Sequence, residues 1–469
     1  MSFSQQLQTI RSGFGRTFWV ANVIELFERF AYYGSKAVLM IYFIEKVQLE
    51  PEAAGWLVGL FTLLLYVLPA FAGAVVDRFG FKRSLLACFA IFSLGYFMIG
   101  MAGLPTFRPW VEAIGALPWM LIALVVTAIG GSLIKPSVVG TVARTTTNET
   151  KSLGYSIYYM LVNIGGAVGP FLATPVRENL GIAWVLVMSA AISVLLAVAT
   201  LLFYKEPPRP VDAGELRSMR RVLADMFLVV GNLRFLTFLL IFSGFWAMFW
   251  QVFLALPVFI KDVLHFPRFE ILETVDAWTI ILVTVAATAL AKRLKPMTAM
   301  TLGFALATAS WFCMVFTPPA WAQVLASPVV LVMNVVLRLL SLTGLPIGTI
   351  ELTPVIAPAV FGLMVFALGE SIQAPRYYEY VANLAPADQV GTYMGVAFLP
   401  IGIGALAAGG LSGWLVSHYI GTTVNGVTTP GPGSAHPSDM WLVVGGIGVV
   451  STVLMLLYDR FLAPRHGTR

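Results

Sequence analysis

The sequence predicts an all-α polytopic membrane protein with twelve transmembrane helices in two bundles of six, and three observations support this class. Of the 469 residues, 58% are apolar and only 11% are charged, whereas soluble proteins carry about twice that share of charged residues. Stretches of about 20 apolar residues, long enough to cross a bilayer as helices, recur along the whole chain. A polar break divides these stretches into two sets of six.

The predicted spans and the polar break define the predicted domains. The spans lie near residues 17–44, 52–76, 84–103, 117–143, 153–176 and 181–204, and then near 235–260, 270–291, 297–317, 351–383, 390–418 and 440–459. We therefore expect an N-terminal bundle at 1–204, a cytoplasmic linker at 205–234 and a C-terminal bundle at 235–469. The linker contains a basic run, Arg217, Arg220 and Arg221, which indicates an amphipathic helix lying on the membrane surface.

The distribution of basic residues predicts the orientation in the membrane. Most of the 29 Lys and Arg residues fall in connections that share one side with both termini. Because cytoplasmic loops carry the excess of Lys and Arg, we expect a protein integral to the cell (inner) membrane with both termini cytoplasmic. The net charge of +6 then follows from topology, and we expect no nucleic acid as a partner.

One apolar stretch, residues 320–346, does not fit twelve crossings. It is apolar enough to span, but a thirteenth crossing would reverse the orientation of every later span. We therefore expect an interfacial helix or a short re-entrant hairpin on the outer face.

Several motifs are absent from the sequence. It contains no phosphate-binding loop, no Cys/His cluster with metal-ligand spacing and no recognisable nucleophile–base pair. We therefore expect no enzyme activity, no metal, no cofactor, and an ion gradient rather than ATP as the energy source. The expected partners are the lipid bilayer and a small-molecule substrate, bound by a monomer.

The first predicted span carries the densest group of charges at membrane depth. An ionisable group there costs several kcal/mol unless it is paired or hydrated, so each is a candidate functional residue. Six polar side chains fall within about 140° of one helix face, which predicts a water-filled path or, alternatively, a structural ion-pair cluster between two helices. They are Glu25, Glu28, Arg29, Tyr32, Tyr33 and Lys36, and the spacing of Glu25 and Arg29 suits an ion pair.

Other predicted spans contain isolated charges. Lys135 in the fourth span needs a carboxylate or an anionic ligand, unless its side chain reaches back to the cytoplasmic surface. Glu370 lies in the middle of the tenth span, whereas Arg376 and Glu379 suit a salt bridge at its cytoplasmic end. Asp276 lies near the outer end of the eighth span, where we expect it to be hydrated.

The run Glu25-x-x-Glu28-Arg29-Phe-x-Tyr32-Tyr33-Gly34 resembles the first-helix signature of the proton-coupled oligopeptide transporter family, within the major facilitator superfamily. Similar matches follow along both halves and leave out only residues 320–346. They include Tyr66, Asp77-Arg78, Lys135-Pro136, Tyr158 to Gly165, Phe245-Trp246 with Gln251, Glu370, Pro375, Leu384-Ala385-Pro386 and Met394-Gly395. The resemblance implies the major facilitator fold, alternating access, and uptake of di- and tripeptides driven by a proton gradient.

The same resemblance implies roles for individual residues. Arg29, Tyr33 and Lys135 would contact the peptide carboxylate, and Asn163 and Tyr66 would hydrogen-bond its backbone. Glu370 would bind its terminal ammonium. Proton coupling would fall to Glu25, Glu28, Arg29 and Lys135. We expect the substrate site to include also Tyr32, Lys36, Trp246, Trp250, Gln251 and Tyr377.

The sequence also departs from this family pattern. The family usually has an acidic residue just before the position of Gln251, where this chain has Phe249 and Trp250. Bulky Arg376 and Tyr377 follow the tenth-helix proline. These changes favour altered proton coupling, and they leave open a non-peptide substrate, anionic or aromatic, or drug efflux. A membrane receptor that binds a ligand without moving it is a third interpretation.

Overall fold

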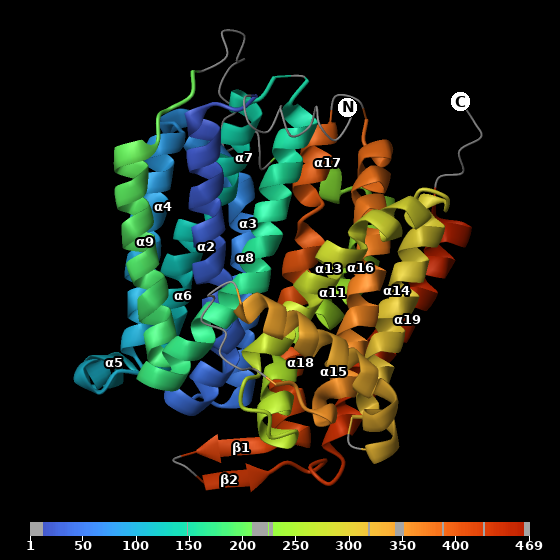
Figure 1. Ribbon diagram of the computed structural model, residues 1–469. Helices are drawn as coiled ribbons and strands as arrows, with labels where there is room; N and C mark the ends of the chain where they lie inside the picture. The colour runs from blue at the N-terminus through green and yellow to red at the C-terminus, as the bar shows by residue number, and fades with distance from the viewer. Residues whose placement is uncertain are drawn as a thin grey trace. The chain divides into compact units, whose positions relative to one another are not determined.

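In the computed structural model the chain is almost entirely helical (Figure 1). The structure describes residues 13–208 except 148, residue 224, residues 228–342 except 318, and residues 351–386, 389–424 and 427–463. Arg217, Arg220 and Arg221 of the expected surface helix lie outside these described residues. That helix therefore stays a prediction.

The chain forms two compact units. The first combines Met1–Val38 with Leu64–Val222, and the second combines Leu39–Leu63 with Leu223–Arg469. The end of the first predicted span and the start of the second therefore make their contacts within the second unit. The domain limits expected at 204 and 235 stay a prediction.

The helices of the first unit succeed one another with short connections. They are α2 (Arg16–Ile41, up to Val38), the later part of α3 (Pro51–Phe79), α4 (Phe81–Met101), η2 (Pro105–Phe107), α5 (Arg108–Ile114), α6 (Ala116–Ser132), α7 (Ile134–Thr145), α8 (Lys151–Leu180) and α9 (Ala183–Phe203). The pair α6 and α7 makes up the fourth predicted span, and their boundary lies just before Lys135.

The second unit holds the remaining elements. They are η1 (Tyr42–Lys46), the start of α3, α11 (Leu233–Phe249), η3 (Trp250–Val252), α12 (Ala255–Val258), η4 (Phe259–Val263), α13 (Glu270–Ala291), α14 (Pro296–Val315), α15 (Ala320–Ser341), η5 (Pro354–Ile356), α16 (Ala357–Leu384), α17 (Val390–Val396), α18 (Leu399–Tyr419), β1 (Gly421–Val424), β2 (Val427–Pro430), η6 (Pro437–Asp439) and α19 (Met440–Phe461).

The prediction of twelve transmembrane helices is confirmed. Each predicted span coincides with one long helix or with a run of consecutive shorter ones. By length and composition, 11 of the described helical segments could cross a membrane; α15 is among these segments, whereas the charge-rich α2 and α13 are not. The antiparallel hairpin of β1 and β2 is an addition to the expected all-α fold. In the sequence, an Asn-Gly dipeptide, residues 425–426, stands between the two strands, and this dipeptide is typical of hairpins.

The extra apolar stretch forms one continuous helix, α15, of 22 residues, so the chain does not turn back between Ala320 and Ser341. The helix packs against η5 and α16. The side-chain amide of Asn334 donates to the Leu352 carbonyl oxygen over 3.0 Å and accepts from the Leu352 N–H over 2.8 Å. This double hydrogen bond holds the segment just before η5 against α15.

The same irregular helix ending occurs once in each half of the sequence. The π-helical turns η1 and η4 are each followed, two residues later, by a residue with positive φ: Gln48 at 61° and His265 at 53°. Both turns belong to the second unit, where Lys261 of η4 pairs with Glu45 of η1. The repetition indicates that the corresponding helices in the two halves of the sequence end in the same way.

Residues after α9 hold the beginning of α4 in the first unit. The Glu206 carboxylate accepts hydrogen bonds from the backbone N–H groups of Phe81 at 2.8 Å and Lys82 at 2.6 Å. Gly80 precedes them with φ of +86°, a conformation that side chains rarely adopt. A carboxylate at a helix N-terminus satisfies free N–H groups and is favoured by the helix dipole.

Candidate functional site

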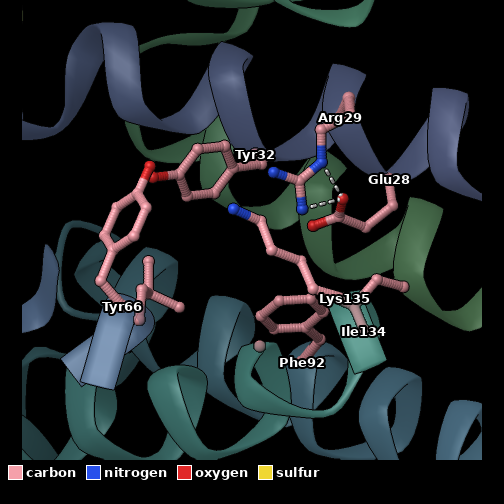
Figure 2. A pocket seen from close by; sticks show the side chains of 9 residues that line it. Glu28, Arg29, Tyr32, Tyr66, Phe92, Ile134 and Lys135 are labelled. Atoms are coloured by element: carbon pink, nitrogen blue, oxygen red, sulfur yellow. Dashed lines mark hydrogen bonds and ion pairs between the residues drawn. The ribbon is translucent and has the colours of Figure 1, made fainter. Parts of the chain in front are cut away.

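Helix α2 places a buried arginine between two buried carboxylates. Nη2 of Arg29 lies 2.5 Å from Oε2 of Glu28, and Nε lies 3.3 Å from Oε1 of Glu25 (Figure 2 shows the pair with Glu28). Glu25 is fully buried and Glu28 is 2% exposed. The ion pair expected from the spacing of Glu25 and Arg29 is confirmed.

Each carboxylate keeps one oxygen available. Tyr158 of α8 donates its hydroxyl to Oε1 of Glu25 at 3.3 Å. Oε2 of Glu25 and Oε1 of Glu28 are buried and have no hydrogen-bond partner within the part of the chain that the structure describes. Buried carboxylate oxygens without donors are costly, and a proton on either acid would reduce that cost.

Close packing of α2 on α8 positions Arg29. A Cβ atom at Gly165 would lie 2.2 Å from the Cβ of Arg29, and one at Gly169 would lie 2.9 Å from the Phe30 carbonyl oxygen. Only glycine allows this approach. At Gly166 the ring of Tyr33 takes the neighbouring space, 3.5 Å from where a Cβ would be.

The cationic side chains and two tyrosines gather around one pocket of the first unit. Lys135 extends its amine toward Tyr32, Tyr66 and the Arg29–Glu28 pair (Figure 2). Its Nζ lies 4.9 Å from the centre of the Tyr66 ring, and the Arg29 guanidinium lies 5.0 Å from that of Tyr32. The pocket is lined by Glu28, Arg29, Tyr32, Leu65, Tyr66, Phe92, Gly131, Ile134 and Lys135.

The charge of this cluster favours an anion. Lys36 joins it through a hydrogen bond from Nζ to the Tyr32 hydroxyl oxygen at 3.2 Å. With every group ionised, three cations, Arg29, Lys36 and Lys135, face two carboxylates, so the cluster carries one net positive charge. A carboxylate or another anionic group entering the pocket would be attracted.

Asn163 is not brought into that pocket. Its amide donates to the Tyr159 carbonyl oxygen of its own helix at 2.8 Å, and it is not among the lining residues. Its expected contact with the peptide backbone stays a prediction.

Trp250 and Gln251 are buried against α18 in the second unit. The indole N–H of Trp250 donates to the Ile401 carbonyl oxygen at 3.1 Å. Gln251 donates weakly to the Ala408 carbonyl oxygen at 3.4 Å and accepts from the Ser412 hydroxyl at 2.7 Å. Both side chains hold α11 and η3 to α18, and their expected contact with substrate stays a prediction.

Tyr377 and Trp246 belong to an aromatic core around α11. The Tyr377 hydroxyl donates to the Ala397 carbonyl oxygen at 2.6 Å, and its ring lies 4.1 Å from that of Phe242, centre to centre. Trp246 is partly buried and contacts the Phe249 ring edge-on at 5.0 Å. The expected contact of Tyr377 and Trp246 with substrate stays a prediction.

Arg376 forms the expected salt bridge and also caps a helix. Nη1 lies 2.5 Å from Oε2 of Glu379. Its other nitrogens donate to the Ala291 carbonyl oxygen at 2.9 and 2.7 Å and to that of Leu294 at 2.6 Å. Arg376 therefore satisfies carbonyl groups at the C-terminal end of α13.

The expectation that Asp276 is hydrated is wrong. Asp276 is only 7% exposed, and its Oδ1 has no hydrogen-bond partner among the residues described. Its helix packs against α16. The sequence contains the signal, an acidic residue in an apolar span, but the packing that buries Asp276 cannot be predicted from spacing along the chain.

Comparisons with known proteins agree with this architecture. A family model described as the Major Facilitator Superfamily matches residues 21–347. Dipeptide and tripeptide permease B of Photorhabdus asymbiotica subsp. asymbiotica is 28% identical over 201 residues, 42% of this chain and 39% of the permease. The permease B of Edwardsiella piscicida is 30% identical over 171 residues, 36% of this chain and 33% of the permease. The matches thus span between a third and two fifths of the length of these relatives.

Solved transporter structures share the fold over nearly the whole chain. A structure described as "Structural insights into substrate recognition in proton dependent oligopeptide transporters" has a TM-score of 0.67 at 18% identity, and covers 95% of this chain and 99% of the other. The nucleoside transporter NupG has a TM-score of 0.67 at 16% identity, with coverage of 95% and 99%. At these identities the likeness concerns the fold alone.

The family model covers most of the chain, and the helices, the first-span motif and the relatives agree with it. The expectation that the chain is not an enzyme is confirmed, because this family consists of transporters. The chain belongs to the Major Facilitator Superfamily, as a divergent relative of its oligopeptide transporters.

Proposed function

We propose that the protein is a secondary active transporter that takes up short peptides or peptide-like compounds by alternating access, driven by a proton gradient. The observation that carries this proposal is the buried cluster of Glu25, Glu28 and Arg29 beside Lys135. It combines acids that can accept protons with cations that can bind a carboxylate. The names of the permease relatives support peptides as the substrate class.

Charge competition around Arg29 links the proton to the substrate. At an effective dielectric constant near 20, opposite charges about 4 Å apart attract by about 4 kcal/mol. A proton on Glu28 removes that attraction and leaves the guanidinium available to a substrate carboxylate. The proton also raises the net positive charge of the cluster by one. Proton and anion binding therefore favour each other, which is the coupling that symport requires.

The setting of the transporter is part of the proposal. We place it in the cell (inner) membrane as a monomer, with both termini in the cytoplasm and no cofactor besides the proton gradient. The bias of Lys and Arg toward one side of the predicted topology supports this orientation.

A second candidate is a carrier of larger anionic or aromatic compounds, including efflux. Phe249 and Trp250 stand where the resembling family usually has an acid. Around them the second unit presents aromatic rings, with Trp246, Phe253 and Phe366 each within 6.0 Å of the Phe249 ring centre. Aromatic side chains offer large apolar contact areas, which would suit an aromatic substrate.

Proteoliposomes test the first candidate against the second. Wild type should exchange labelled Ala-Ala in counterflow and accumulate it when the outside is made acidic. Glu28→Gln should lose driven accumulation but keep counterflow, because the site remains while the proton acceptor is gone. Glu112→Gln, an exposed acid paired with Arg108, is the control and should behave as wild type.

Three outcomes would contradict the proposal. Accumulation by Glu28→Gln at the wild-type level would remove Glu28 from proton coupling. Failure to exchange Ala-Ala, together with transport of a larger anionic or aromatic compound, would favour the second candidate. Binding of Ala-Ala without counterflow would favour the third interpretation, a membrane receptor that binds a ligand without moving it.

A further inference from the structure

A groove in the second unit lies between helices α14, α15 and α16, which Figure 1 labels. It encloses about 230 Å³. Helix α15 lines it along one face from Trp321 to Val329, the end of α14 lines it with Cys313 and Phe316, and the start of α16 lines it with Phe361. Because Trp321 and Val329 are eight residues apart, the groove follows α15 over about 12 Å. Its shape therefore suits a linear apolar group.

Small side chains on α15 leave this space open. Ala322 and Ala326 are four residues apart and therefore lie on one face of the helix, and both line the groove. Ala322 is buried and Ala326 is half-buried. At the rim, the rings of Phe316 and Trp321 lie 5.7 Å apart, centre to centre. The groove is therefore formed by packed helices, with α15 lying against α16.

The lining of the groove is unsuited to water. None of its side chains is charged, and only the weak Cys313 thiol and the Trp321 indole N–H can form hydrogen bonds. A buried water typically needs about three polar partners, which these two groups do not supply. An empty groove is also unfavourable, because its lining atoms would lose dispersion contacts. The structure therefore favours an apolar occupant.

The groove opens onto the surface that the bilayer covers. All three helices are long and apolar enough to cross a membrane, and the chain belongs to a superfamily of membrane transporters. Leu325 lines the groove and is 75% exposed, and Val324 beside it on α15 is 72% exposed. Lipid chains cover such exposed apolar side chains, and the groove continues the same apolar surface inward to the half-buried Cys313. The apolar material that meets the groove is therefore lipid.

We propose that the groove between α14, α15 and α16 binds one acyl chain of a membrane phospholipid. Lipid tails are as apolar as the lining, so a chain that leaves the bilayer for the groove gains little hydrophobic free energy. The groove holds the chain through contacts on three sides, which a chain lying on one exposed helix face does not have. This inference goes beyond the proposed function and depends neither on the substrate nor on the proton.

A photoreactive lipid tests the proposal on the unaltered full chain. The protein is placed in vesicles of phosphatidylcholine that carries a diazirine within one acyl chain, and after irradiation the modified residues are located by mass spectrometry. We expect adducts at the half-buried lining residues Cys313, Ala326 and Val329, besides those on exposed side chains. Adducts confined to outward-facing side chains such as Val324 and Leu331 would overturn the proposal, because they would come from the surrounding bilayer alone.

Filling the groove tests the same claim through lipid retention. In Ala326→Phe the new ring occupies space that the chain would take. Ala320→Phe is the matched control, because it makes the same change at an exposed position of α15 that does not line the groove. Native mass spectrometry of protein transferred from phosphatidylcholine vesicles into detergent should show one lipid fewer on Ala326→Phe than on wild type, and the wild-type number on Ala320→Phe.

Either of two retention results would overturn the inference. One is equal lipid retention by wild type and Ala326→Phe. The other is a lipid-free dimer of the wild type, which would identify a second copy of the chain as the occupant. If Ala326→Phe does not fold, the adducts on the wild type decide the matter, because they require no substitution.

Discussion

Replacing Gly165 by alanine should displace Arg29 and destabilise the first unit. The new Cβ would lie 2.2 Å from the Cβ of Arg29 and 3.1 Å from its Cγ, whereas carbon atoms in contact are normally about 3.5–4.0 Å apart. Tilting α8 gives little relief, because the two helices are already in close contact one turn further on. There the Phe30 carbonyl oxygen lies 2.9 Å from where a Cβ at Gly169 would be. The helices α2 and α8 would have to move apart locally by more than about 1 Å.

The size of the effect follows from the packing. Inserting a methyl group into a tightly packed interior costs about 1–3 kcal/mol, and alanine in a helix returns about 0.5–1 kcal/mol relative to glycine. The difference spans about 0–2.5 kcal/mol, and because the overlap with the Cβ of Arg29 is severe, we expect a net loss in its upper part, about 2 kcal/mol of the free energy of unfolding. The contact of Arg29 with Glu25, at 3.3 Å the longer of its two ion pairs, should lengthen first, so transport should fall as well.

Thermal unfolding and Ala-Ala counterflow of the purified protein measure both effects. Gly73→Ala is the matched control, because it lies within α3 of the same unit and its Cβ would meet nothing within 4 Å. Gly73→Ala should melt at or above the wild-type temperature and transport normally. A Gly165→Ala protein with wild-type melting temperature and counterflow would refute the reasoning.

Three further substitutions test contacts at helix ends. Glu206→Gln replaces the charged acceptor at the start of α4 and should lower stability by about 1 kcal/mol in thermal unfolding; an unchanged melting temperature would show that the capping contributes nothing. Arg376→Lys keeps the charge but loses the planar group that reaches several oxygens at once, so it should melt below wild type, and equal stability would refute the capping of α13. Asn334→Ala leaves the Leu352 N–H without its acceptor, at a cost of about 1–3 kcal/mol. Faster hydrogen exchange at Leu352 is the expected result, and unchanged exchange would contradict it.

Much of the fold could be predicted because a bilayer restricts both length and composition. A helix that crosses it needs about 20 apolar residues, so the spans were visible in the sequence without any knowledge of their neighbours. The same reasoning predicted one face of α2 from a rotation of 100° per residue. The ion pair of Glu25 with Arg29 followed from it, because both partners belong to one helix.

Contacts between distant segments could not be predicted in this way. Asp276 and Glu370 belong to different helices, and nothing in the spacing of either helix indicates that α13 packs against α16. The resemblance identified Gln251 as part of a motif, but the hydrogen bond from Ser412 depends on how α18 packs. Gly165 was likewise recognised as part of a motif, whereas its contact with Arg29 became visible only from the packing of α8 on α2.

The buried acids of the two units differ in the cations beside them. In the proposed mechanism Arg29 and the proton compete for the carboxylates of Glu25 and Glu28, so we expect proton exchange to depend on where Arg29 lies and therefore on the packing around Gly165. In the second unit no described Lys or Arg pairs with Asp276 and Glu370. In the proposed mechanism the compensating positive charge at Glu370 is the ammonium group of the substrate. Because a ligand shifts an equilibrium only through its different affinity for the two states, we expect an anionic group to act on the first unit by displacing Arg29 from its carboxylates, and a cationic group to act on the second unit through Glu370.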